Sequence, residues 1–106
     1  MIHCVCIDDT NRPKEIPTEK WIVKDASYNI IHVSIHTLQG GIQGVTLKEI
    51  TLDESCMPYQ SFRLSRFAVQ LKDLEKLIEL MKNCSELSNV DILKLIEESN
   101  LQLVEN

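Results

Sequence analysis

The chain has 106 residues, of which 43% are hydrophobic and 25% are charged, and its formal net charge is −5. This length and composition predict one folded domain with its own core, and they exclude the disordered class of chain. The acidic balance argues against nucleic acid as a partner, because phosphate groups are bound by clustered Lys and Arg side chains.

The cysteines and the N-terminal residues bear on the compartment. Cys4, Cys6, Cys56 and Cys84 could form two disulfides in a secreted chain, but the first residues do not form a charged and apolar leader. No apolar run approaches the roughly 20 residues that cross a bilayer. We therefore expect a cytoplasmic protein with reduced cysteines and no membrane contact.

Apolar residues alternate, or come in short β-branched runs, from Met1 to about Gln70, and this pattern predicts strands. The expected strands cover residues 2–8, 28–37, 42–52 and 62–69, with a short additional strand over 21–24. The first strand is apolar on both faces, so we expect it to be covered on both sides.

Turn-forming residues separate these strands. Residues 9–27 contain two prolines and several charges, which predicts a long irregular loop with Trp21 as its buried anchor. Gln39-Gly40-Gly41 supplies the positive φ values of a tight hairpin. Residues 53–61 contain the third proline and are expected to form a polar loop.

From about Leu71 onward the apolar spacing becomes helical. A first helix is predicted over 73–83, with an apolar stripe formed by Leu74, Leu77, Ile78 and Met81. A second helix is predicted to start at Ser88, a typical N-cap residue that pairs with Asp91 in a capping-box-like arrangement. Its apolar side is expected to consist of Val90, Leu93 and Ile96, widened by Ile92 and Leu95.

The change of pattern near position 70 predicts an α+β fold. Residues 1–70 are expected to form a small closed or partly open β-barrel of about five strands, followed by two helices in residues 71–106. The helical extension must bury its apolar stripe, because isolated helices of this length are marginal in water. It either packs on the barrel or forms a subunit interface, and both alternatives stay open.

A set of motifs between residues 4 and 70 carries a family resemblance. The motifs are Cys6-Ile7-Asp8-Asp9, Arg12-Pro13-Lys14-Glu15-Ile16-Pro17, Trp21-Ile22-Val23-Lys24, Tyr28, Leu47-Lys48-Glu49-Ile50, Pro58-Tyr59, Phe62 and Arg66-Phe67. In this order and spacing the chain resembles a family of small uncharacterised phage and prophage proteins that is common in gut bacteria. Relatives usually carry a glycine before the tyrosine-bearing strand, where this chain has Asp25, a residue that tolerates a left-handed turn better than most.

The resemblance implies an SH3-like β-barrel and a viral or mobile-element origin, and it implies no activity. SH3-like barrels commonly bind extended peptide segments in an aromatic groove beside their long early loop. Because aromatic and Arg side chains dominate binding hot spots, the expected partner-binding residues are Trp21, Tyr59, Phe62, Arg63 and Arg66. The alternative is that these aromatic side chains pack in the core.

Two sets of potential metal or catalytic residues have a simpler interpretation. Cys4 and Cys6 form a Cys-x-Cys beside His3, which a soft metal could use, but a structural zinc site needs four ligands. We interpret these cysteines as small buried hydrophobes. His32 and His36 share one face of a predicted strand, and we interpret them as polar residues on its solvated face.

Asp8 and Asp9 end the first strand at a loop. Paired carboxylates at such a position can coordinate Mg²⁺ or act as acid and base. Because Thr10 and Asn11 follow, the same residues equally form an Asx-type turn, and we favour the turn.

The sequence therefore predicts a non-catalytic binding module without metal or cofactor, whose partner is a protein of host or virus. One alternative is a structural or assembly protein that forms a homodimer through residues 71–106. The other is a small metal-dependent enzyme that uses Asp8, Asp9, His32 or His36.

Overall fold

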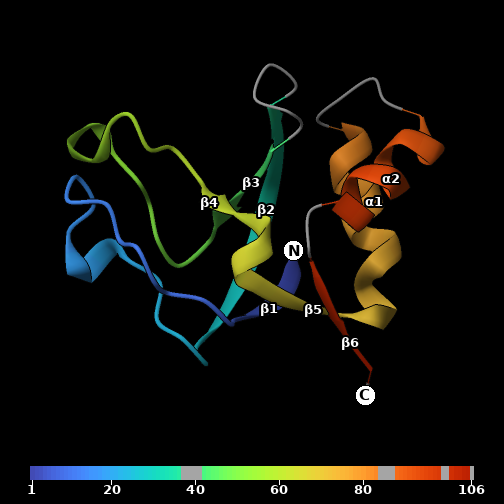
Figure 1. Ribbon diagram of the computed structural model, residues 1–106, viewed down its shortest axis with the longest axis horizontal. Helices are drawn as coiled ribbons and strands as arrows, with labels where there is room; N and C mark the ends of the chain where they lie inside the picture. The colour runs from blue at the N-terminus through green and yellow to red at the C-terminus, as the bar shows by residue number, and fades with distance from the viewer. Residues whose placement is uncertain (37–41, 84–87, 99–100, 106) are drawn as a thin grey trace.

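The structure is a computed structural model that describes residues 1–36, 42–83, 88–98 and 101–105. Within these ranges it has mixed α+β architecture, with a curled half-barrel sheet of six strands and two α-helices (Figure 1). The strands are β1 (Ile2–Cys6), β2 (Ser27–His36), β3 (Ile42–Leu47), β4 (Phe62–Arg63), β5 (Phe67–Gln70) and β6 (Gln102–Val104). The helices are α1 (Leu74–Asn83) and α2 (Asn89–Glu98).

The strands follow the order β4-β3-β2-β1-β5-β6 across the sheet. Neighbouring strands pair antiparallel except β5 and β6, which pair in parallel. The first strand thus lies inside the sheet, between β2 and β5. Strands far apart in the sequence are joined by β1, and the residue after it, Ile7, donates its N–H to the Arg66 carbonyl at 2.8 Å.

Side-chain alternation along β1 directs its even-numbered residues into the core. Ile2, Cys4 and Cys6 are buried, whereas His3 is exposed and Val5 is half-buried. The prediction that both faces of this strand are covered is therefore wrong for His3, because the outer face of the sheet is open at that point.

A β-bulge in β2 keeps apolar side chains on the inner face of the sheet both before and after it. The pairing with β3 shifts between Ile30 and His32, so Ile31 is an extra residue, and its side chain is exposed. After the bulge Val33 returns to the buried face while His32 lies on the exposed face. Without the bulge, regular alternation would place His32 on the buried face and Val33 on the exposed face.

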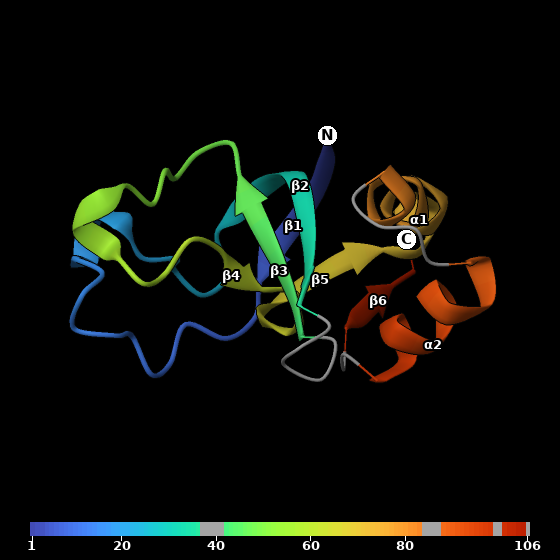
Figure 2. The same cartoon turned by 90° about the horizontal axis from the view of Figure 1, so that it is seen from above.

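The sheet lies between two different coverings, as both views show (Figures 1 and 2). The loops formed by residues 7–26 and 48–61 lie side by side on one side of it, and α1 and α2 lie on the other. The buried residues of the two helices belong to the same hydrophobic cluster as those of the strands. In the described ranges, no helix has both the length and the apolar character that a membrane span requires.

The two predicted helices are confirmed, but the predicted buried side of the second is wrong for Val90 and Leu93. In α1, Leu77 and Met81 are buried. Ser88 caps α2, with its Oγ 3.3 Å from the Asp91 backbone N–H that donates to it. Val90 and Leu93 are exposed, and α2 packs through Ile92 and Ile96, which are one turn apart.

Several strand predictions change in the structure. Residues 21–24 are irregular, β3 ends at Leu47, and the predicted strand over 62–69 is divided by a 3₁₀ turn, η4 (Leu64–Arg66), which buries Leu64. A further change is β6, a strand within the extension that was expected to be helical. The predicted hairpin at Gln39-Gly40-Gly41 lies outside the described residues.

Asp25 adopts the left-handed conformation that the chain needs before β2. Its φ is 71°, and its N–H donates to the Cys6 carbonyl 2.8 Å away. A non-glycine residue there bears a small steric cost that Asp tolerates.

Candidate functional site

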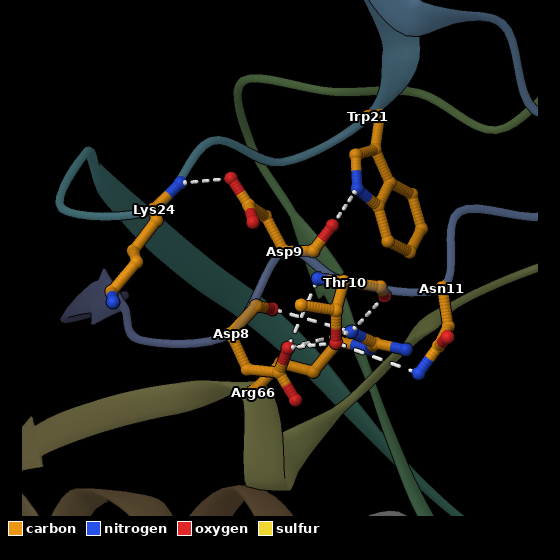
Figure 3. Close-up of polar contacts among 7 residues, drawn as sticks. All are labelled: Asp8, Asp9, Thr10, Asn11, Trp21, Lys24 and Arg66. Atoms are coloured by element: carbon orange, nitrogen blue, oxygen red, sulfur yellow. Dashed lines mark hydrogen bonds and ion pairs between the residues drawn. The ribbon is translucent and has the colours of Figure 1, made fainter.

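The loop after β1 begins with a turn built by Asp8. Its carboxylate accepts hydrogen bonds from the Thr10 backbone N–H (3.0 Å) and the Thr10 hydroxyl (2.5 Å) (Figure 3). These two hydrogen bonds lower the pKa of Asp8. The predicted Asx-type turn is therefore confirmed, and one carboxylate oxygen of Asp8 is already engaged.

Arg66, at the end of η4 and directly before the neighbouring strand β5, holds this turn in place. Its Nη1 donates to the Thr10 carbonyl (2.7 Å) and the Asp8 carbonyl (3.3 Å), and it lies 3.5 Å from the Asp8 carboxylate (Figure 3). The side chain of Arg66 is only 15% exposed. Hydrogen bonds from a guanidinium at a shielded position are among the stronger contacts a loop can have.

Trp21 contacts both Arg66 and the backbone of the first loop. The Arg66 guanidinium carbon lies 5.1 Å from the centre of the indole ring, and the Trp21 Nε1 donates to the Asp9 carbonyl at 2.7 Å. The Phe62 ring lies beyond it, at a centroid distance of 5.7 Å. Arg66, Trp21 and Phe62 are thus linked by one cation–π contact and one tilted ring contact, and we call these three residues the clamp stack.

Asp9 faces away from Asp8 and has a different role. Its Oδ2 accepts a hydrogen bond from the Lys24 backbone N–H at 2.9 Å, which ties the beginning of the loop to its end (Figure 3). The two carboxylates therefore serve two separate backbone contacts. Among the residues that the structure describes, no group of three His, Cys, Asp or Glu side chains is placed to hold a metal ion.

The structure distributes the five expected partner-binding residues over two environments. Trp21, Phe62 and Arg66 are brought together in the clamp stack, where Phe62 is buried and the other two are half-buried. Tyr59 and Arg63 do not join that stack, and both are exposed. The expected set is therefore divided between residues that hold the loops and residues that face solvent.

The second long loop is joined to the first by contacts that sequence reasoning missed. The Lys20 ammonium pairs with the Asp53 carboxylate, which also accepts from the Ser55 N–H at 3.0 Å. These hydrogen bonds, from Lys20 first and then from Ser55, lower the pKa of Asp53 to about 2. The Asp-x-Ser spacing signals a local turn, but a pair 33 positions apart leaves no signal in the sequence.

The two loops also bury two apolar side chains, Ile16 and Cys56. Residues 54–56 form the 3₁₀ turn η3 (Glu54–Cys56), and the Tyr59 N–H donates to the Cys56 carbonyl at 2.9 Å. Between these anchors Met57 is 52% exposed and Tyr59 is 39% exposed. We call Met57 and Tyr59 the loop-tip pair.

Cys4, Cys6 and His32 are placed as their simpler interpretation predicts. Cys4 and Cys6 point into the core, and burial raises the pKa of Cys4 to about 12, which keeps its thiol protonated. His3 lies on the opposite face of β1 and His32 is exposed on β2. His36 belongs to β2, but its side chain lies outside what the structure describes.

No protein-family model, curated protein or solved structure matches this chain.

Proposed function

We propose that this chain is a non-catalytic protein-binding module of the phage or prophage kind, with a host or viral protein as its partner. We further propose that its sheet is an SH3-like barrel. Support comes from five strands that follow one another as β5-β1-β2-β3-β4 around a curled sheet. A long first loop and a 3₁₀ turn leading into β5 add to that support.

The loop-tip pair carries the proposal. Met57 and Tyr59 are exposed on a loop that is otherwise fixed by buried Cys56 and by Asp53. A loop already held in one conformation loses little conformational entropy when it binds. Exposed Tyr and Met side chains on such a loop are the residue types that protein interfaces favour.

The five expected residues then have two kinds of role. Tyr59 contacts the partner, and Arg63, exposed on the edge strand β4, supplies a charged contact beside it. Trp21, Phe62 and Arg66 hold the first loop against the sheet through the clamp stack. Their replacement would weaken binding indirectly, through the loop.

The test is site-specific photo-crosslinking in the host, followed by affinity measurement. A photo-crosslinking amino acid placed at Tyr59 should capture a protein that the same group at Leu93, an equally accessible apolar position on α2, does not capture. With that protein purified, Tyr59→Ala should weaken binding at least tenfold in calorimetry while Leu93→Ala leaves it unchanged. Equal losses from the two variants, or none from Tyr59→Ala, would contradict the proposal.

A second candidate is an assembly protein that dimerises through its helices, and the exposed face of α2 favours it. Val90 is 74% exposed and Leu93 is 46% exposed, although both are apolar. Two copies packing these faces would remove them from water. Sedimentation equilibrium tests this candidate. The wild-type chain must be a dimer, and the double variant Val90→Asp with Leu93→Asp must be a monomer.

A further inference from the structure

The strand β6 is attached to the molecule along one side only. It has three residues, all of them exposed, and its side chains Leu103 and Val104 are 38% and 46% exposed. It pairs in parallel with β5, matching Ala68 to Gln102 and Gln70 to Val104. No other described strand pairs with it, so it forms the margin of the sheet (Figure 1).

The neighbouring strand, β5, is by contrast buried in the core. Phe67, Ala68 and Val69 of β5 are all buried, and the other edge of β5 pairs with β1. The outer edge of β5 therefore carries main-chain N–H and C=O groups that need partners, and β6 supplies them. What β6 contributes is mainly this hydrogen-bonding ladder.

Side chains add a small amount of specificity to the ladder. Val104 lines a shallow hollow together with Leu71, and the hollow is bordered by Gln70, Lys72 and Glu105. Leu71 is itself 41% exposed, so the hollow offers apolar surface next to the charged residues Lys72 and Glu105. A strand seated on β5 is thus recognised by its main chain and by one apolar side chain at the position of Val104.

We propose that the outer edge of β5 is a strand-acceptor site that takes the β6 strand of a second copy of this chain. The segment that fits the site is visible, because β6 itself occupies it. Every contact that β6 makes with β5 in one chain is available with β5 of another, so exchange preserves the ladder and the Val104 contact. This inference concerns the sheet margin and does not depend on the loop-tip pair.

The β6 strand of the same chain competes with the β6 strand of a second copy for the edge of β5. A tethered strand acts at an effective concentration on the order of millimolar, so the second copy competes only when the protein is concentrated. Exchange between two chains closes on itself and leaves no new edge, which predicts a dimer without further growth.

Complementary cysteine variants test the exchange in the full chain. A chain with Ala68→Cys is mixed with a chain with Gln102→Cys, so that a 68–102 disulfide can form only between two copies in the β5–β6 register. The matched control replaces Gln102→Cys by Glu105→Cys, three residues out of register. After mild oxidation of the folded, concentrated mixture, peptide mapping should find the 68–102 bridge at least tenfold above the 68–105 bridge. Equal yields, or no bridge, overturn the proposal.

A labelled peptide with the sequence of residues 101–106 provides an independent measurement. Leu103→Pro with Val104→Pro removes two successive N–H groups from β6, one of which must point toward β5. This variant should bind the peptide at least tenfold more tightly than wild type, with Glu105→Pro behaving as wild type and a scrambled peptide failing to bind. Equal affinity of the double variant and wild type overturns the proposal.

The two experiments can also be read together. If the double variant binds the peptide but no 68–102 bridge forms, the edge of β5 accepts a strand of another protein. That result overturns the proposal that a second copy of this chain occupies the edge.

Discussion

At the scale of single residues, Arg66 organises more of the site than any other side chain described above. One guanidinium contacts two backbone carbonyls and a carboxylate of the first loop and also covers the Trp21 ring. A planar group with several N–H donors can make these contacts at once, and a lysine ammonium lacks that fork geometry. Arg63, three residues earlier, is exposed on β4.

The first prediction compares these two arginines. Arg66→Ala should lower the free energy of unfolding by about 2 kcal/mol, because it removes a guanidinium on a side chain that is only 15% exposed, with its charge-assisted hydrogen bonds to two loop carbonyls and its cation–π contact. Arg66→Lys should recover only part of that loss. Urea unfolding followed by Trp21 fluorescence measures both, and Arg63→Ala, expected within about 0.5 kcal/mol of wild type, is the control. Equal effects of Arg66→Ala and Arg63→Ala would refute the role given to Arg66.

At the scale of elements, the two long loops stabilise each other through Lys20 and Asp53. The pKa of Asp53 is lowered in the folded protein by hydrogen bonds from Lys20 and Ser55, and the pKa of Lys20 is raised chiefly by its hydrogen bond to Asp53. A carboxyl whose pKa is lower when folded stabilises the fold above its unfolded pKa. That stabilisation is lost as the pH falls through the folded value.

The second prediction follows from that sign. The stabilisation from Asp53 should be complete above about pH 4, near the ordinary pKa of Asp, and should disappear as the pH falls toward about 2. Asp53→Asn should therefore lose less stability than wild type between these pH values, although it is less stable at pH 7. Unfolding curves across this range measure the difference. A wild-type profile for Asp53→Asn would refute the linkage.

At the scale of the whole molecule, one buried polar residue joins the sheet to the second helix. Gln43 of β3 is 4% exposed, and its Nε2 donates to the Leu95 carbonyl of α2 at 2.8 Å. Leu95 lies among the last four residues of α2, whose carbonyls need partners from outside the regular helix ladder. The Gln43 Oε1 has no hydrogen-bond partner among the described residues, so only one polar atom of this side chain is satisfied.

The third prediction uses that imbalance. Gln43→Glu should lower the free energy of unfolding at pH 7 by about 3 kcal/mol, because it buries a carboxylate and removes the donor to Leu95. Gln43→Leu, of similar volume, should cost about 1 kcal/mol or less, since it removes the unsatisfied Oε1 as well as the donor. Chemical unfolding with amide exchange in α2 measures both. If Gln43→Glu were as stable as wild type, this position would not be buried in solution.

The local features of this protein were determined by the sequence itself. Alternation predicted that Ile2, Cys4 and Cys6 share one face of β1, and all three are buried. Ser88 with Asp91 predicted the start of α2, and Asp8 with Thr10 predicted the first turn. Asp25, a residue type that tolerates a left-handed turn, has a φ of 71°. Each of these depends on neighbours within a few positions, where backbone geometry leaves few alternatives.

Only the tertiary structure decided which long-range partners meet. Lys20 with Asp53, Arg66 with Thr10, and Gln43 with Leu95 are each more than 30 positions apart, and their residue types are common at any surface. The three-residue strand β6 has too little periodicity to be recognised, and its conformation comes from the unpaired edge of β5. Likewise α2 is apolar on two sides, so packing against the sheet selected Ile92 and Ile96 for burial and left Val90 and Leu93 in solvent.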